Sequence, residues 1–137
     1  MREQIPIKFQ QFIPMLKKIQ EKIALNAFII FGSQARGNAL PHSDFDILLI
    51  GNFHKSYFKR CLDILQFAPP VAIDLFCYSI SEFEEKFYNY NLTAIDAIDE
   101  GFILLGTKFV EKYKQKLQYF KEHGLKKEDH ILKPPVF

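Results

Sequence analysis

Long apolar runs, cysteines and net charge are all scarce in this chain of 137 residues. No stretch approaches the roughly 18 apolar residues that span a membrane, and the first residues lack a signal-peptide pattern, so we expect a protein that is neither inserted nor exported. The two cysteines, Cys61 and Cys77, form no CxxC motif, and we interpret them as buried thiols in a reducing cytoplasm. The formal net charge of +2 is too small to indicate direct binding of nucleic acid.

Hydrophobic residues, by contrast, make up 48% of the chain, and 15 residues are Phe. A chain of this length and composition can bury a core without disulfides or structural metals. We therefore predict a single domain over residues 1–137, with a core at about 20–106, a C-terminal helix at 107–123 and a tail at 124–137.

Helices and strands alternate along the chain, which predicts an α/β (α+β) fold. The periodicity and turn signals place strands at 26–31, 44–50, 71–78 and 102–105. They place helices at 7–23, 33–37, 55–67, 82–89, 92–100 and 107–123. Pro14 lies inside the first of these helices, so we expect a kink or a restart there.

Several helix features are specific enough to be tested. In helix 55–67 we expect Phe58, Leu62 and Leu65 to point inward. Ser81 and Glu84 have the spacing of a capping box, which would start helix 82–89.

The last two helices carry similar signals. Gly101 is expected to end helix 92–100 in the C′ position, and Thr107 to cap the next helix. The last helix carries an apolar stripe whose members are Phe109, Tyr113, Leu117 and Phe120. This stripe suits a core or a partner surface, because lysines 112, 116 and 121 flank it.

The segment from residue 28 to residue 50 organises the chain. Two short apolar runs enclose a polar loop, and the second run opens on Asp44 and Asp46. Residues i and i+2 of a strand face the same side, so both carboxylates should point to one place. Such a pair is costly unless a cation neutralises it, and Mg²⁺ prefers oxygen ligands. A turn-and-cap role for the Ser-Asp sequence is the alternative.

The first apolar run ends in a Gly-Ser turn. Gly32 permits a tight conformation, Ser33 offers a hydroxyl, and residues 34–36 form one helical turn with N–H groups for an anion. For this turn to meet the acid pair, the two strands must be antiparallel neighbours. A phosphate cradle beside metal-binding acids indicates a nucleoside triphosphate site. It is not a Walker-type loop, because Asn38-Ala39 follows Gly37 where Lys-Ser/Thr is required.

A third acid, Asp74, is the single charged residue in strand 71–78. Burying it without a partner would be costly, so a metal or an active-site cleft explains it, and so does a salt bridge to a lysine. Ser33 can act as a helix cap, and Arg36 can pair with a surface acid instead of a phosphate. His42, in the loop, is interpreted as solvated.

The spacing Gly32-Ser33-x-Ala35-Arg36-Gly37, followed by Ser43-Asp44-x-Asp46, resembles the GSxARG…SDxD motif of the minimal nucleotidyltransferases. These form part of the DNA-polymerase-β-like nucleotidyltransferase superfamily. The resemblance implies the fold of that superfamily, a small mixed sheet of about four strands packed with helices. It also implies that Asp44, Asp46 and Asp74 are catalytic and bind metal, while Gly32, Ser33, Arg36 and Ser43 contact the nucleotide.

The resemblance further implies an activity, which is transfer of AMP from ATP with two Mg²⁺ ions. Stand-alone members often act as the antitoxin of a HEPN-type toxin, and transfer AMP to a tyrosine of that toxin. We therefore expect a protein acceptor, and an oligomer is compatible with this. Transfer to a small molecule such as an aminoglycoside is the first alternative. The second is a non-catalytic antitoxin that only masks its partner.

Overall fold

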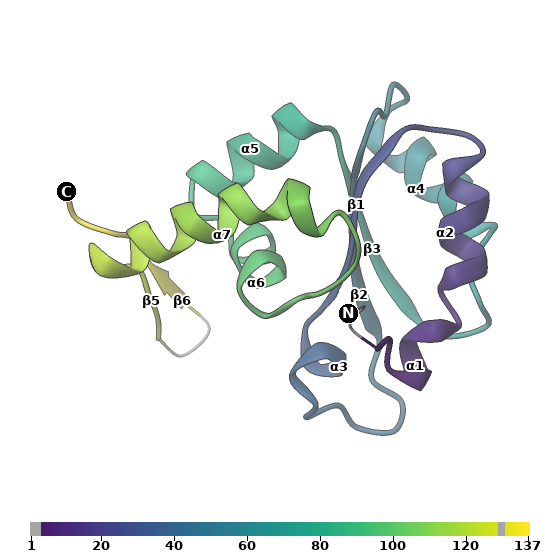
Figure 1. Cartoon of the computed structure of the whole chain (residues 1–137), viewed down its shortest axis with the longest axis horizontal. Coiled ribbons are helices and arrows are strands. Elements are labelled where there is room, and N and C mark those ends of the chain that lie inside the picture. The colour runs from purple at the N-terminus through teal and green to yellow at the C-terminus, as the bar shows by residue number, and fades with distance from the viewer. Residues whose placement is uncertain (1–3, 129–130) are drawn as a thin grey trace.

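A four-stranded mixed sheet with helices on both faces forms the centre of the computed structural model, which describes residues 4–128 and 131–137 (Figure 1). The strands are β1 (Leu25–Phe31), β2 (Phe45–Gly51), β3 (Ile73–Tyr78), β4 (Phe102–Leu105), β5 (Lys126–Glu128) and β6 (Ile131–Lys133). The helices are α1 (Ile7–Gln10), α2 (Ile13–Gln20), α3 (Ser33–Arg36), α4 (Tyr57–Leu65), α5 (Ile80–Tyr88), α6 (Leu92–Glu100) and α7 (Thr107–Glu122). The predicted α/β class with a mixed four-stranded sheet is confirmed.

The strand order β3-β2-β1-β4 places β1 and β2 at the centre of the sheet. β1 is antiparallel to both β2 and β4, while β2 is parallel to β3. The predicted antiparallel pairing of the first two strands is thus confirmed, and it sets Phe31 opposite Asp46. A parallel pair requires a crossover, which α4 supplies between β2 and β3.

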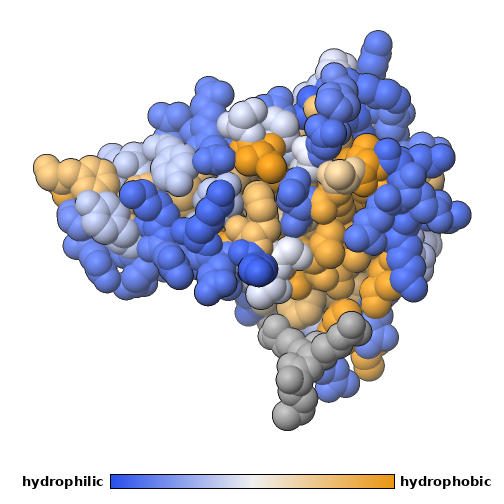
Figure 2. Space-filling view, turned by 45° about the horizontal axis from the view of Figure 1, so that its top comes forward, coloured by the Kyte–Doolittle hydropathy of each residue, from blue (hydrophilic) through white to orange (hydrophobic). Residues whose placement is uncertain are grey.

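The sheet is buried on both faces, which explains the unbroken apolar runs of its central strands. Along β1, Ile29 and Phe31 join the core under α5, α6 and α7, while Phe28 and Ile30 join the core under α1, α2 and α4. Figure 1 shows these two sets of helices on opposite sides of the sheet. In Figure 2, hydrophobic residues gather between the two helical halves.

The first predicted helix divides as Pro14 suggested. α1 ends at Gln10, and α2 begins at Ile13 with Pro14 in its first turn. A proline fits there because its missing N–H would have no partner in the first turn. Of the residues the structure describes, none belong to a helix long and apolar enough to cross a membrane.

The predicted inward face of α4 was wrong. Phe58, Leu62 and Leu65 are 72%, 54% and 38% exposed. The helix buries Ile64 and the aliphatic and guanidinium parts of Arg60 instead.

The reason is the edge strand β3, along which α4 lies. The Arg60 guanidinium donates to the carbonyl of Cys77 at 3.3 Å, and the Tyr57 hydroxyl donates to the carbonyl of Leu75 at 3.4 Å. These donors satisfy carbonyl groups on the free edge of the sheet. Helical periodicity could not reveal this, because α4 carries polar groups on the side that faces the sheet edge. Cys77 is buried and Cys61 half-buried, as free thiols, and burial raises the pKa of the Cys77 thiol.

The capping box of α5 lies two residues earlier than predicted. The Ser79 hydroxyl accepts from the N–H of Glu82 at 3.2 Å, and the Glu82 carboxylate accepts from the N–H of Ser79 at 2.7 Å. The Ser81–Glu84 prediction was therefore wrong. Both serines precede an acid by three residues, and the end of β3 at Tyr78 decides between them.

The glycines around β4 also differ from expectation. Gly101 ends α6 with φ −71, which is not the left-handed C′ conformation. A side chain there would meet the Ala97 carbonyl at 2.2 Å and Ile29 at 2.3 Å, so close packing requires the glycine. Gly106, with φ +100, is the N-cap of α7, and Thr107 is its first helical residue rather than its cap.

The aromatic stripe of α7 belongs to the core. Tyr113, Leu117 and Phe120 are buried and Phe109 is half-buried, which removes the stripe as a partner surface. The predicted tail is more ordered than expected, since β5 and β6 form an antiparallel hairpin. Beyond the hairpin, the N–H of Val136 donates to the carbonyl of His123 at 2.8 Å, which fastens the chain end to α7.

Candidate active site

The candidate acids lie at the end of the sheet where the parallel strands β2 and β3 both begin. Asp46 and Asp74 are register partners on these parallel strands, so their side chains leave the same face side by side. Asp44 directly precedes β2. Asp46 is half-buried, whereas Asp44 and Asp74 are exposed. The structure thus brings all three predicted acids to one edge.

Asp46 is the electrostatic centre of this group. Burial raises the pKa of the Asp46 carboxyl above its ordinary value of 3.8, and repulsion from Asp74 and then Asp44 raises it further. For Asp74 the prediction rested on the cost of burying a charge, and that reasoning was wrong because the side chain is exposed. Its position in register with Asp46 supports a role at the site.

The Gly-Ser turn lies directly against Asp46. Gly32 has φ +74, and a Cβ built on it would lie 2.0 Å from Asp46 Oδ2. Glycine is therefore required twice, for its backbone conformation and for the carboxylate beside it. Ser33 is the first residue of α3 and is half-buried. The antiparallel pairing of β1 and β2 produces this contact, as the sequence indicated.

Gln34 is a site residue that the sequence did not reveal. It is only 8% exposed, and its Nε2 donates to the backbone oxygen of Ser43 at 2.9 Å. Lys8 of α1 donates to the backbone oxygen of Gln34 at 2.5 Å. The Ser43 hydroxyl in turn accepts from the N–H of Leu40 at 2.8 Å. Gln34 thus braces the Gly-Ser turn against the loop that leads into Asp44.

Arg36 points to α6, where it donates to Glu100 at 2.8 Å. This hydrogen bond is the main cause that raises the pKa of the Arg36 guanidinium. Asp96, one turn earlier on α6, pairs with Lys127 of β5 at 3.3 Å, and burial raises its pKa. The structure therefore shows the surface-acid alternative for Arg36. Acids at i and i+4 on a helix resemble a solvated face, so the sequence carried no signal for Asp96 and Glu100.

The acids have the chemistry of a divalent-cation site, since clustered carboxylate oxygens are the ligands of Mg²⁺. Gly32 leaves room for one of those oxygens against the turn. Within residues 4–128 and 131–137, however, no three His, Cys, Asp or Glu side chains are close enough together to hold one metal ion. Repulsion between like charges favours this spacing. His42 is exposed and lines an open hollow of about 600 Å³ beside Lys8, Gln34 and Ser43.

A glycine turn pressed against one of three acids, at the edge of a mixed sheet, is the arrangement expected of a nucleotide-transferring enzyme. The chain belongs to the nucleotidyltransferase domain family, whose model matches residues 13–135. The resemblance seen in the Gly-Ser and Asp-x-Asp motifs is thereby confirmed. Among curated proteins, none matches the chain.

Solved structures share the fold. A chain from a toxin–antitoxin crystallised with AMP-PNP has a TM-score of 0.56 at 17% identity, over 85% of this chain and 89% of that one. Two chains from mutants of the toxin–antitoxin MntA-HpeT both have a TM-score of 0.52. In one mutant two aspartates two positions apart are replaced by glutamate, and the identity is 15% over 83% of this chain and 86% of that one. In the other a tyrosine is replaced by alanine, and the identity is 17% over 88% and 89%. At these identities the likeness concerns the fold.

Proposed function

We propose that this nucleotidyltransferase transfers AMP from ATP to a hydroxyl group of a protein, and that it depends on a divalent cation. The observation that carries this proposal is the contact between Gly32 and Asp46, with Asp74 in register beside Asp46. A triphosphate lying along the turn would bring its α-phosphorus next to the acids. The match to the nucleotidyltransferase family supports the same reaction class.

In this mechanism each residue has a distinct role. Asp44 and Asp46 would hold cations beside the triphosphate, and a carboxylate oxygen of Asp74 would orient the acceptor hydroxyl or take its proton. Two bound Mg²⁺ ions would neutralise phosphate charge and lower the pKa of the acceptor hydroxyl. The acceptor oxygen forms a bond to the α-phosphorus as the bond to pyrophosphate breaks. The backbone at Gly32 and the hydroxyl of Ser33 position the leaving phosphates.

Arg36 and Ser43 are proposed as two further contacts to the nucleotide. Arg36 would exchange Glu100 for a phosphate oxygen when the nucleotide binds. The Ser43 hydroxyl accepts from the N–H of Leu40, and its own O–H proton would donate to a phosphate oxygen.

We propose a HEPN-type toxin as the acceptor, modified on a tyrosine. The solved structures that share the fold come from toxin–antitoxin complexes, one of them crystallised with AMP-PNP. The resemblance to the minimal nucleotidyltransferases implies the same partner class. The C-terminal part of the chain is used by the core, since α7 buries its aromatic stripe, which favours an acceptor brought by another protein.

The test uses the protein encoded by the neighbouring gene, incubated with the full chain, ATP and Mg²⁺. We expect the intact mass of that neighbour to rise by one or more AMP units, and EDTA to prevent it. Asp74→Asn should abolish the change, while Asp63→Asn, a matched substitution on α4, should not. Gly32→Val should weaken binding of a non-hydrolysable ATP analogue, because its side chain would displace Asp46.

Three outcomes would contradict parts of the proposal. Modification of an aminoglycoside but not of the neighbour would move the acceptor to small molecules. Neutralisation of the neighbour by the Asp74→Asn variant as fully as by the unaltered protein would indicate masking without catalysis. Unchanged nucleotide affinity in Gly32→Val would place the nucleotide elsewhere.

A further inference from the structure

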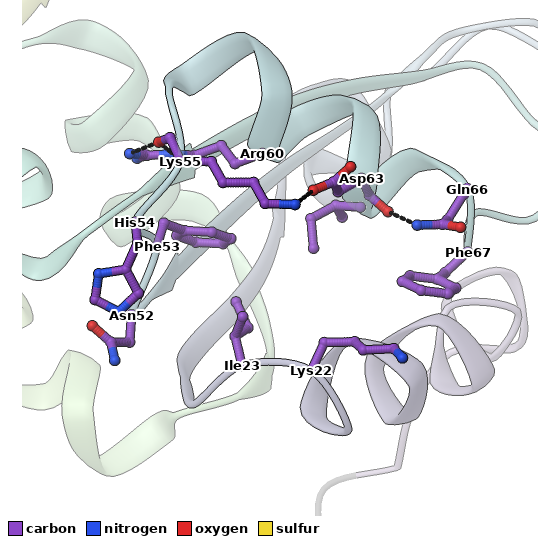
Figure 3. Close-up of a pocket in the computed structure, with 11 residues that line it drawn as sticks. Lys22, Ile23, Asn52, Phe53, His54, Lys55, Arg60, Asp63, Gln66 and Phe67 are labelled. Carbon is purple, nitrogen blue, oxygen red and sulfur yellow. Dashed lines mark hydrogen bonds and ion pairs between the residues drawn. The ribbon is translucent and has the colours of Figure 1, made fainter.

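A pocket of about 370 Å³ lies between the turn after α2, the segment after β2, and α4 (Figure 3). These segments lie at the end of the sheet opposite α3 (Figure 1). None of the predicted site residues line it. Asn52 at its rim lies six residues along the chain from Asp46, which is about 20 Å in an extended strand. A ligand here could not touch the reacting phosphate.

The interior of this pocket is apolar. Phe53 and Ile64 are buried, and Ile23 and Phe67 are half-buried. Figure 3 shows the Phe53 ring and Ile23 pointing into the space from one side, with Phe67 at the far end. The volume falls in the lower part of the range for small-molecule sites, about 300–1,000 Å³. Such a space suits a flat apolar group.

The rim of the pocket is positively charged. Lys22, Lys55 and Arg60 line it. Lys55 pairs with Asp63 and Arg60 pairs with Glu82, so Lys22 supplies the uncompensated positive charge. Lys22 makes no ion pair or side-chain hydrogen bond with any other residue that the structure describes, and Figure 3 shows its amino group beside the opening near Phe67. A cationic ligand would meet this excess of positive charge. An anion would be attracted by it.

Arg60 gives the pocket a rigid wall. Its guanidinium lies 5.4 Å from the centre of the Phe53 ring and is held by the carbonyl of Lys55 and by Glu82 at 2.6 Å. At 8% exposure it is the one buried charged residue within the part of the chain that the structure describes. The wall is therefore formed before any ligand arrives, which reduces the ordering cost of binding.

We propose that this pocket is a second ligand site, separate from the acids, that binds a small aromatic anion. The aromatic body would lie against Phe53, Ile23 and Phe67, and the anionic group would pair with Lys22 at the rim. The inference is independent of the transfer reaction, because it uses no residue of the candidate active site.

The test uses two probes that share one aromatic skeleton and differ by a sulfonate group. 8-Anilino-1-naphthalenesulfonate carries a sulfonate, and N-phenyl-1-naphthylamine is its neutral counterpart; the fluorescence of both rises in apolar sites. We expect saturable binding of the sulfonate, with amide shifts in ¹H–¹⁵N spectra at Asn52, Phe53 and Phe67. Lys22→Glu should weaken the sulfonate by about tenfold, since repulsion replaces attraction, and leave the neutral probe within about twofold. Mg²⁺–ATP should displace neither probe.

Two control variants locate the binding. Lys59→Glu changes the net charge equally on an exposed position of α4 outside the pocket, and should leave the sulfonate within about twofold. Leu62→Glu disrupts the exposed apolar face of α4 and should also have little effect. The proposal is overturned if Lys59→Glu weakens binding as much as Lys22→Glu, if Leu62→Glu removes it, or if the shifts lie away from the pocket.

Discussion

Asp46 is the residue at which burial, charge and backbone geometry meet. Its carboxylate touches the Gly32 turn, adjoins Asp74 in register and is partly withdrawn from water. Burial first, and then repulsion from Asp74 and Asp44, disfavour the ionised form and raise the pKa of Asp46 above 3.8. The ionised carboxylate of Asp46 therefore lowers the stability of the fold, as expected of a residue that is retained for its function. Two predictions concern single residues of the site.

The first prediction concerns Asp46→Asn. Because the folded state holds this proton more tightly than the unfolded chain, the free energy of unfolding falls as pH rises from about 3.8 through the raised pKa. Removing the carboxylate should therefore raise the melting temperature at pH 7 and reduce that loss of stability between acid and neutral pH. Transfer should fall by at least about a hundredfold. Thermal unfolding across pH measures the change in stability, and intact-mass assays measure the transfer. Retained transfer, or a stability profile parallel to that of the unaltered protein, would reject the proposed role of Asp46.

The second prediction concerns the pair between Arg36 and Glu100. If Arg36 must leave Glu100 to reach a phosphate, Glu100→Gln should tighten nucleotide binding. A partly exposed ion pair is worth up to about 1 kcal/mol, so the gain should be about fivefold or less. Calorimetry with a non-hydrolysable ATP analogue measures it, and Arg36→Ala should have the opposite effect. Equal affinities in all three proteins would mean that Arg36 only anchors α3 to α6.

At the scale of single elements, the end of one element decides the start of the next. β3 continues to Tyr78, which leaves Ser79 at the N-cap of α5 although Ser81 has the same local spacing to an acid. α4 shows the same dependence, since its sheet-facing side was selected by the free edge of β3 and not by its own apolar stripe.

The third prediction compares two serines on this basis. Ser79→Ala removes the acceptor for the N–H of Glu82 and should lower the free energy of unfolding by about 1 kcal/mol. Ser81→Ala removes only a hydroxyl contact on the surface and should change it by less than about 0.5 kcal/mol. Urea denaturation with a common slope separates the two. Equal losses would mean that α5 begins elsewhere.

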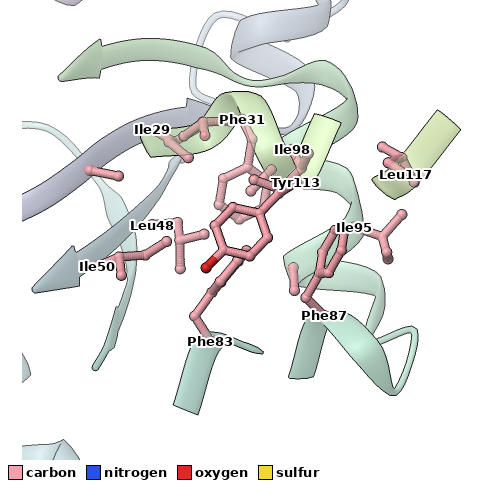
Figure 4. Packing of buried hydrophobic residues seen from close by; sticks show 14 of the residues in the cluster. Ile29, Phe31, Leu48, Ile50, Phe83, Phe87, Ile95, Ile98, Tyr113 and Leu117 are labelled. Carbon is pink, nitrogen blue, oxygen red and sulfur yellow. The ribbon is translucent and has the colours of Figure 1, made fainter. Parts of the chain in front are cut away.

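At the scale of the whole molecule, two hydrophobic cores cover opposite faces of one sheet. They fix the strands β2 and β3, at whose beginning the candidate acids lie. Tyr113 of α7 lies in the middle of one core, with Phe83 and Phe87 at ring distances of 5.0 and 5.4 Å (Figure 4). Its hydroxyl is buried and has no hydrogen-bond partner among the described residues. Burial raises the pKa of Tyr113 to about 12.

The fourth prediction follows from that hydroxyl. Tyr113→Phe keeps the ring and removes an unsatisfied polar group, so it should raise the free energy of unfolding by up to about 1 kcal/mol. It should also remove a loss of stability between pH 10 and about 12, where the unfolded tyrosine ionises before the folded one. Tyr113→Ala should lower stability by about 3–5 kcal/mol through the cavity it leaves. A destabilised Tyr113→Phe variant would show that the hydroxyl has a partner.

The sequence by itself determined the four strands of the central sheet, the Gly-Ser turn and the acids at the start of the second and third strands, but not the C-terminal hairpin of β5 and β6. These features depend on short spacings, such as i to i+2 in a strand, that are the same in any fold. The pairing of β1 with β2 also followed, because a turn and an acid pair can meet only if those strands are antiparallel.

Tertiary structure alone decided the buried face of α4, the brace from Gln34 to Ser43 and the partner of Arg36. Each depends on a contact that local periodicity does not encode; the Arg36–Glu100 pair joins residues 64 positions apart. The exposure of Asp74 belongs to this group as well, since β3 forms the edge of the sheet and not its centre. An edge strand and a central strand can share one apolar pattern, and only the neighbouring elements determine which of its side chains meet water.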